Sequence, residues 1–164
     1  RLAVIEFNPR LASQFSDLYR RVLGLDAHAM SVALALGEDP LALPRTAPRA
    51  GAAASLVYRS FDPGSQAPMP GHGARAALAQ AHPDALLFTY PKSGHSLARD
   101  FKWLGNHRYG ILHLDGRDEV HLRQRCEHAS ALLGWTPPYA DLLAGQGAGE
   151  RGLIGGALLP DGSP

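Results

Sequence analysis

The 164-residue sequence has little of the chemistry that marks several common protein classes. Its one cysteine, Cys126, excludes a disulfide framework and a zinc site built on several cysteines, and it favours a reducing, cytoplasmic setting. Sixteen basic and fifteen acidic side chains leave a formal net charge of +1, which gives no electrostatic basis for binding nucleic acid. No apolar run approaches the roughly 18–20 residues of a membrane span. We therefore expect neither nucleic acid nor a membrane among its partners.

The start of the sequence lacks two further features. It has no initiator methionine and no basic-then-apolar leader. Residues 2–5 are already apolar and have the composition of a buried strand. We expect the sequence to open inside a domain whose N-terminal part is missing.

Turn-forming residues and changes in composition divide the chain into four segments. The predicted segments are residues 1–38, a linker over 39–54, a small α/β lobe over 55–135 and a glycine- and proline-rich tail over 136–164. The linker holds three prolines, whereas the lobe alternates apolar runs with helical patterns. The sequence thus predicts an α/β (α+β) fold with a C-terminal lobe after a short N-terminal segment.

The N-terminal segment is predicted to contain one strand and two helices. Residues 2–7 read as a short apolar strand that ends at a proline. Ser13 is placed to cap a helix that runs to about Leu23, with Gly24 after its last turn. Asp26 is placed to cap the second helix.

Periodicity in the predicted lobe indicates strands separated by helices. The predicted strands cover 55–61, 85–90 and 107–114, and the predicted helices cover 74–81 and 118–133. Residues 92–96 are predicted to form a glycine loop with polar donors. Cys126 lies on the apolar stripe of the last helix, which favours a core position over a nucleophilic role.

Three chemically capable side chains gather at the end of the first predicted strand. Alternation puts Glu6 and Asn8 on one face of that strand, and Arg10 follows just beyond it. Carboxylate and amide oxygens are the hard donors that Mg²⁺ prefers, and a guanidinium offers a planar fork to a carboxylate or phosphate. The alternative is an edge strand with solvated polar residues. Against it, apolar neighbours would half-bury the carboxylate, which then needs a partner.

These residues carry a resemblance to a known family. Residues 6–10 (Glu-Phe-Asn-Pro-Arg), the helix after them, and Gly-Leu-Asp at 24–26 resemble the C-terminal part of an ATP-grasp domain. Residues 92–95 and 107–111, with the helix that follows, resemble more loosely the small lobe after this domain in biotin-carboxylase-like and amino-acid-ligase-like enzymes. The resemblance implies that the adenine pocket, a phosphate-gripping lysine and a further acidic metal ligand precede the start of this sequence.

The resemblance implies a ligase that uses ATP to activate a carboxylate as an acyl-phosphate and joins it to an amine. Glu6 and Asn8 would ligate Mg²⁺ or Mn²⁺ at the ATP phosphates, and Arg10 would steady the transferred phosphoryl group or the substrate carboxylate. Ser13 and Gln14 are candidate substrate contacts, with helix capping the favoured role of Ser13. The implied partners are a small carboxylate and a small amine, and a homodimer stays open. With its ATP-binding part missing, the chain alone is expected to be inactive.

Biotin carboxylation is the nearest alternative activity. Enzymes of that kind carry an ionisable base shortly after the arginine, whereas residues 11–15 have no ionisable side chain and Gln14 only hydrogen-bonds. Ligation of a carboxylate to an amine is therefore favoured. Outside the enzymes, a non-catalytic interaction module stays open. The eight histidines, including His107 and His113 on one predicted strand, show no metal-ligand spacing.

Overall fold

A computed structural model describes residues 11–64 and 68–140 of the chain. The predicted strand over 2–7 lies outside the described residues, together with Glu6, Asn8 and Arg10. The same holds for residues 141–164 of the predicted tail. The fold below therefore concerns the two predicted N-terminal helices, the linker and the lobe.

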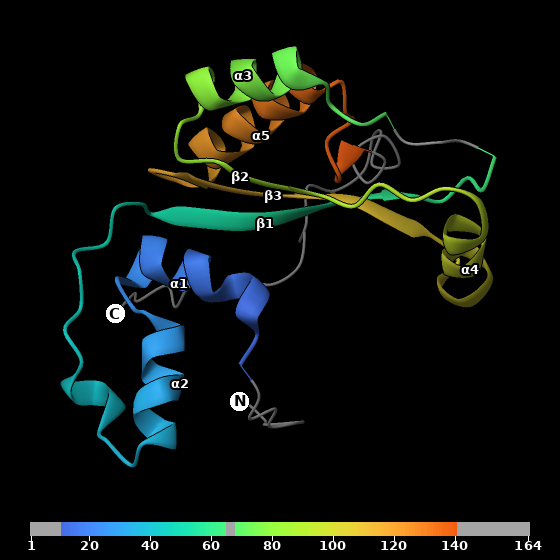
Figure 1. Cartoon of the computed structure of the whole chain (residues 1–164). Coiled ribbons are helices and arrows are strands. Elements are labelled where there is room, and N and C mark those ends of the chain that lie inside the picture. Colours follow the sequence, from blue (N-terminus) through green and yellow to red (C-terminus); the bar gives the residue numbers. More distant parts are fainter. Residues whose placement is uncertain (1–10, 65–67, 141–164) are drawn as a thin grey trace, which may run out of the picture.

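Three antiparallel strands form the sheet (Figure 1). The long strand β3 (His107–Gly116) lies at its centre, between β1 (Ala52–Ser60) and β2 (Leu86–Thr89). β1 pairs with β3 along its whole length, whereas β2 pairs only with residues 110–113 of β3. The mixed α and β class expected from the sequence is confirmed.

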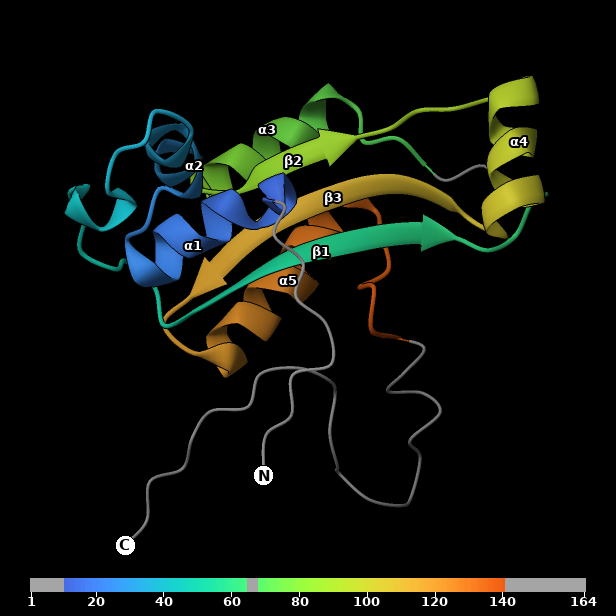
Figure 2. The ribbon, with the colours of Figure 1, turned by 90° about the horizontal axis from the view of Figure 1, so that it is seen from below.

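Helices lie on both faces of this sheet (Figures 1 and 2). α3 (His72–Ala81) and α5 (Glu119–Leu133) pack together on one face, and α1 (Ser16–Leu23) crosses the other. α2 (Ala27–Ala35) packs against α1, and α4 (Gly94–Leu104) lies beyond one end of the sheet. The first of the two predicted N-terminal helices is thus in direct contact with strands of the predicted lobe, and the second packs on the first.

The apolar core lies between the sheet and α5. Its buried members are Tyr58, Leu78, Leu112, Leu114, Cys126, Ala129, Leu133 and Trp135. Strand alternation sends Leu112 and Leu114 of β3 into this core, while Ile111, His113 and Asp115 project towards α1. The predicted core position of Cys126 is confirmed. The central strand β3 therefore contributes side chains to an apolar core on one face and to a polar cluster on the other.

Helices α2 and α5 begin at aspartates. Asp26 Oδ1 accepts hydrogen bonds from the backbone N–H groups of His28 and Ala29 at 3.1 and 3.0 Å. Asp118 Oδ1 accepts one from the backbone N–H of His121 at 2.7 Å. These bonds satisfy N–H groups that have no partner inside a helix, which is why local sequence was enough to place both helix starts.

Three local predictions are wrong. Ser13 does not cap α1, because it begins a 3₁₀ turn, η1 (Ser13–Phe15), and the N-cap of α1 is Phe15, whose side chain makes no capping bond. The predicted loop over 92–96 instead contains the start of α4 at Gly94. Lys92 Nζ donates to both carboxylate oxygens of Asp100, at 2.9 and 2.8 Å. This contact attaches α4 to the segment that precedes it. The strand β1 also begins at Ala52, earlier than predicted.

A buried ion-pair network fastens α1 to the end of the sheet. The Arg21 side chain of α1 is only 2% exposed. Its Nη1 lies 3.0 Å from Asp115 Oδ2 and its Nε lies 2.6 Å from Asp17 Oδ2. Its Nη2 also donates to the backbone carbonyl of Asp84 at 2.8 Å. A single guanidinium thus links helix, central strand and the turn before β2.

Arg125 of α5 reaches the same carboxylates from the opposite face. Its Nη2 lies 2.5 Å from Asp84 Oδ1, and its Nη1 lies 2.8 Å from Asp115 Oδ1. Burial opposes the ionisation of Asp84, but the hydrogen bond from Arg125 prevails and lowers the pKa of that carboxyl to about 2. Two arginines on opposite faces therefore share two carboxylates at one end of the sheet.

Replacing Arg21 by methionine should destabilise the protein by about 3–5 kcal/mol, because buried carboxylates lose their cation. Urea unfolding at neutral pH measures this change. The matched control is Arg20→Met, one residue earlier on α1, where the side chain is 60% exposed. That control should change the free energy of unfolding by less than about 0.5 kcal/mol. Equal effects of the two variants would show that the network does not hold α1.

The network also predicts a loss of stability in acid. Because the native pKa of Asp84 is about 2 against an ordinary value of 3.8, the unfolded chain binds a proton at Asp84 first as the pH falls. The stabilisation is complete above about pH 5 and disappears progressively towards pH 2. Urea unfolding over this range should show the loss, and Asp84→Asn should reduce its slope. An unchanged slope in that variant would contradict the assignment.

Candidate functional site

A cavity of about 410 Å³ lies on the α1 side of the sheet. Side chains from η1, α1, α2, β2 and β3 line it. Both predicted substrate contacts, Ser13 and Gln14, are on its wall. Gln14 Nε2 donates to Ser55 Oγ on β1 at 2.8 Å, which fixes the orientation of the Gln14 amide. The fold therefore brings these two residues to a cavity, and their contact with substrate stays a prediction.

Two arginines give the cavity a cationic rim. Arg20 of α1 is exposed, and the nearest carboxylate oxygen to its guanidinium, on Asp17, is 4.0 Å from Nη2. Arg108 of β3 is also exposed, and its guanidinium lies 4.7 Å from the ring centre of Tyr90. A guanidinium that is held only loosely, or by stacking, keeps N–H donors for an incoming carboxylate or phosphate.

The sequence predicts a role for neither arginine. Arg20 has the spacing of an ordinary solvent-facing residue in a helix. Arg108 stands inside the stretch 107–111 that carries the looser resemblance, which was the only signal for it in the sequence. The two arginines are 88 positions apart in the sequence. Only the packing of α1 on β3 brings their side chains to one cavity.

Two buried polar side chains at the cavity have no hydrogen-bond partner among the described residues. Ser16 and His113 are each 5% exposed, and the unpaired atoms are Ser16 Oγ and both ring nitrogens of His113. Asp17 Oδ2 approaches His113 Nδ1 to 3.5 Å without forming a hydrogen bond. Because buried polar atoms are nearly always paired, these atoms indicate a site for a polar ligand or for water.

His113 is held in its uncharged form. Burial lowers its pKa below the ordinary value of 6.5, and the nearby Asp17 carboxylate offsets only part of that effect. The edge-to-face contact with Phe88, with ring centres 5.6 Å apart, adds an apolar neighbour. At neutral pH the cavity therefore contains a neutral imidazole, which is a better proton acceptor than an imidazolium.

The remaining wall of the cavity is apolar. Leu86 and Phe88 of β2 and Ile111 of β3 line it. Leu86 and Phe88 remain partly exposed because α1 does not extend over β2 (Figure 2). The cavity thus combines a cationic rim, a polar floor that includes the Asp17 carboxylate, and an apolar wall, the usual composition of a site for a small organic ligand.

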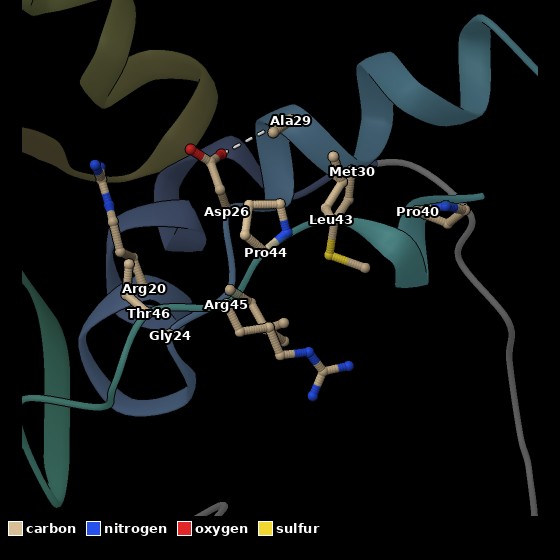
Figure 3. A pocket seen from close by; sticks show the side chains of 11 residues that line it. Arg20, Gly24, Asp26, Ala29, Met30, Pro40, Leu43, Pro44, Arg45 and Thr46 are labelled. Carbon is tan, nitrogen blue, oxygen red and sulfur yellow. Dashed lines mark hydrogen bonds between the residues drawn. The ribbon is translucent and has the colours of Figure 1, made fainter. Parts of the chain in front are cut away.

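A second cavity, of about 370 Å³, lies between the α1–α2 turn and the connector that contains η2 (Pro40–Ala42) (Figure 3). Met30, Leu43 and Pro44 line it with apolar surface. The guanidinium groups of Arg20 and Arg45 point away from each other (Figure 3). Because its charges do not converge, this cavity offers a weaker polar site than the first.

The structure describes no metal centre within residues 11–64 and 68–140, where no three His, Cys, Asp or Glu side chains are grouped to hold an ion. The predicted ligands Glu6 and Asn8 lie outside those ranges, as does Arg10. The Mg²⁺ site therefore stays a prediction. Over the same ranges, none of the helices combines the length and the apolar composition needed to cross a membrane.

Comparison with known proteins adds no assignment. No family model matches the chain, and neither a similar curated protein nor a similar solved structure is found. The chemistry of the site must therefore be argued from its own residues.

Removing a cation from the rim should weaken anion binding. Arg108→Met should reduce the affinity for 4-methylpentanoate, a carboxylate with a branched apolar tail, by about tenfold, because a charge-assisted hydrogen bond is lost. Titration followed by NMR measures this affinity. Arg99→Met on α4, away from the cavity lining, is the control for overall charge and should leave the affinity unchanged. Equal weakening by both variants would reject the cavity as the anion site.

Proposed function

We propose that the chain is the C-terminal part of an ATP- and Mg²⁺-dependent ligase, which activates a carboxylate as an acyl-phosphate and joins it to an amine. The observation that carries the proposal is the cavity that contains Ser13, Gln14, Arg20 and Arg108. Its cationic rim fits a small substrate that carries a carboxylate. The first cavity residues in the sequence, Ser13 and Gln14, come shortly after Arg10 of the Glu-Asn-Arg motif.

Chain geometry connects the motif to the cavity. Three peptide units separate Arg10 from Ser13, so the Cα atoms of these two residues stay within about 11 Å of each other in any conformation. A group that steadies a transferring phosphoryl and a cavity that holds a substrate must be within such a distance to act on one reaction. The covalent spacing is therefore compatible with one combined site.

Each residue has a distinct role in the proposal. Glu6 and Asn8 hold Mg²⁺, which neutralises charge on the ATP phosphates. Arg10 donates to the transferred phosphoryl group or to the carboxylate that receives it. Arg20 and Arg108 bind the anionic group of the substrate in the cavity. Positioning and charge stabilisation of this kind are the main protein contributions to phosphoryl transfer.

One observation favours the alternative of a non-catalytic interaction module. Val32 and Leu34 on α2 and Leu36 at its end are all well exposed, although they are apolar. Such a surface is typical of contact with further protein. The alternative predicts no ATP turnover, so an activity measurement separates it from the ligase.

The test uses the protein translated from its complete reading frame. Glu6→Gln keeps the shape of the side chain but removes its charge, so ATP turnover at limiting Mg²⁺ should fall about a hundredfold, or ~3 kcal/mol. Arg10→Lys keeps the charge but loses the bidentate fork, and its effect should appear in turnover if Arg10 acts on the phosphoryl group. Asn8→Asp keeps an oxygen donor, so metal binding should survive while turnover falls.

The matched control is Glu38→Gln, an exposed glutamate beyond the end of α2, which should leave turnover unchanged. Release of phosphate from ATP, measured with and without a carboxylate and an amine, gives the readout. If the variants at all three motif positions keep the turnover of the original protein at limiting Mg²⁺, the motif is not the site and the ligase proposal fails.

A further inference from the structure

His113 has an unusual environment for a histidine with no assigned role. It lies on the central strand β3, faces α1 and contacts the cavity. From α1, Asp17 and Arg21 face it, and from β2 the Phe88 ring meets it. Its partner across the sheet on β1 is the uncharged Ser55. The other ionisable groups at the cavity, besides Asp17, are Arg20, His28, Tyr90 and Arg108.

The Asp17 carboxylate favours one of the two neutral tautomers of His113. A carboxylate attracts an N–H and repels a lone pair, and Asp17 Oδ2 lies 3.5 Å from His113 Nδ1, close enough for this electrostatic preference although no hydrogen bond forms. The neutral ring therefore favours its N–H at Nδ1, and Arg21 Nε, 2.6 Å from the same oxygen, holds the Asp17 carboxylate in place. His113 Nε2 is left with a lone pair and, among the described residues, no donor.

We propose that His113, oriented by Asp17, is the proton acceptor for the amine substrate. This inference rests on the proposed ligase function and adds a residue and a substrate class to it. The ammonium group donates to Nε2 and transfers one proton to its lone pair, which leaves a neutral amine and an imidazolium. The amine nitrogen then attacks the acyl carbon, the bond from that carbon to the phosphate oxygen breaks, and the second proton leaves with the phosphate.

The cavity also limits the kind of amine. Arg20 and Arg108 repel a simple alkylammonium ion, but they attract an amine that carries its own carboxylate. Leu86 and Phe88 offer an apolar wall for a side chain. The substrate class that fits is an α-amino acid with a branched apolar side chain. Both ring nitrogens of His113 are buried in this structure, so the amine reaches Nε2 only when side chains at the cavity move.

Three probes separate the two charged groups of such a ligand. Leucine carries both, 4-methylpentanoate lacks the amine, and 3-methylbutylamine lacks the carboxylate. Nitrogen NMR of the His113 ring in the 164-residue chain should show that leucine lowers the pKa of His113, because an ammonium beside Nε2 disfavours the imidazolium. 4-Methylpentanoate should raise that pKa, and 3-methylbutylamine should bind more weakly than leucine. If leucine leaves the His113 signals unmoved or raises the pKa, the proposal is overturned.

A pair of variants gives a second measurement. His113→Gln keeps a polar group near the position of Nε2 but cannot take up a proton there. It should lower the affinity for leucine about tenfold and leave the affinity for 4-methylpentanoate unchanged. His95→Gln on α4, away from the cavity lining, should change neither affinity. If His113→Gln lowers the affinities for leucine and 4-methylpentanoate equally, His113 has a structural role only, and its role as proton acceptor is rejected.

The outcomes also distinguish this inference from the ligase itself. In the protein from the complete reading frame, His113→Gln should remove the acidic limb of the pH profile of amide formation, because that limb reports protonation of the acceptor. No ATP turnover, combined with the leucine-induced pKa change, would reject the ligase and leave leucine binding at His113 standing. Turnover with an unchanged acidic limb would reject only the role of His113.

Discussion

The fold depends on the carboxylates that Arg21 and Arg125 share across the end of the sheet. α1 has eight residues, fewer than an isolated helix needs to be stable in water, so tertiary contacts must hold it. Arg21 supplies the most direct of these contacts, because its guanidinium reaches Asp115 on β3 and the backbone of Asp84 before β2. Asp115 is bound in turn by Arg125 from the other face. One polar cluster thereby connects both helical layers.

The candidate site is a consequence of that attachment. Once α1 lies across the sheet, it buries His113 together with its own Ser16, and the polar side-chain atoms of both have no hydrogen-bond partner among the described residues. The same helix carries Asp17, which contacts both Arg21 and His113. Stability and chemistry thus meet at Asp17: its i,i+4 pair with Arg21 within α1 positions the guanidinium that fastens the helix to the sheet, and its approach to His113 favours one tautomer of the imidazole.

Local signals in the sequence located most helices and strands but not how they pack. The Asp26 and Asp118 caps act through bonds to the next few residues, so short-range sequence sufficed. The failure at Ser13 has a tertiary cause, since the chain there turns as a 3₁₀ segment while Gln14 bonds to Ser55 on a distant strand. The sequence did not predict α4, because its first residue, Gly94, has a positive φ of 53° and the local sequence there is typical of a turn.

The sequence by itself determined the mixed α and β class and the core position of Cys126, whereas the metal and phosphate site that it predicts at residues 6–10 lies outside the described residues. Ser13 and Gln14 were also singled out from sequence. Only the tertiary structure decided that Arg108 and His113 join them, because strand alternation gives two faces and does not say which one a helix will cover. That choice depends on long-range burial and charge pairing, which no local pattern encodes.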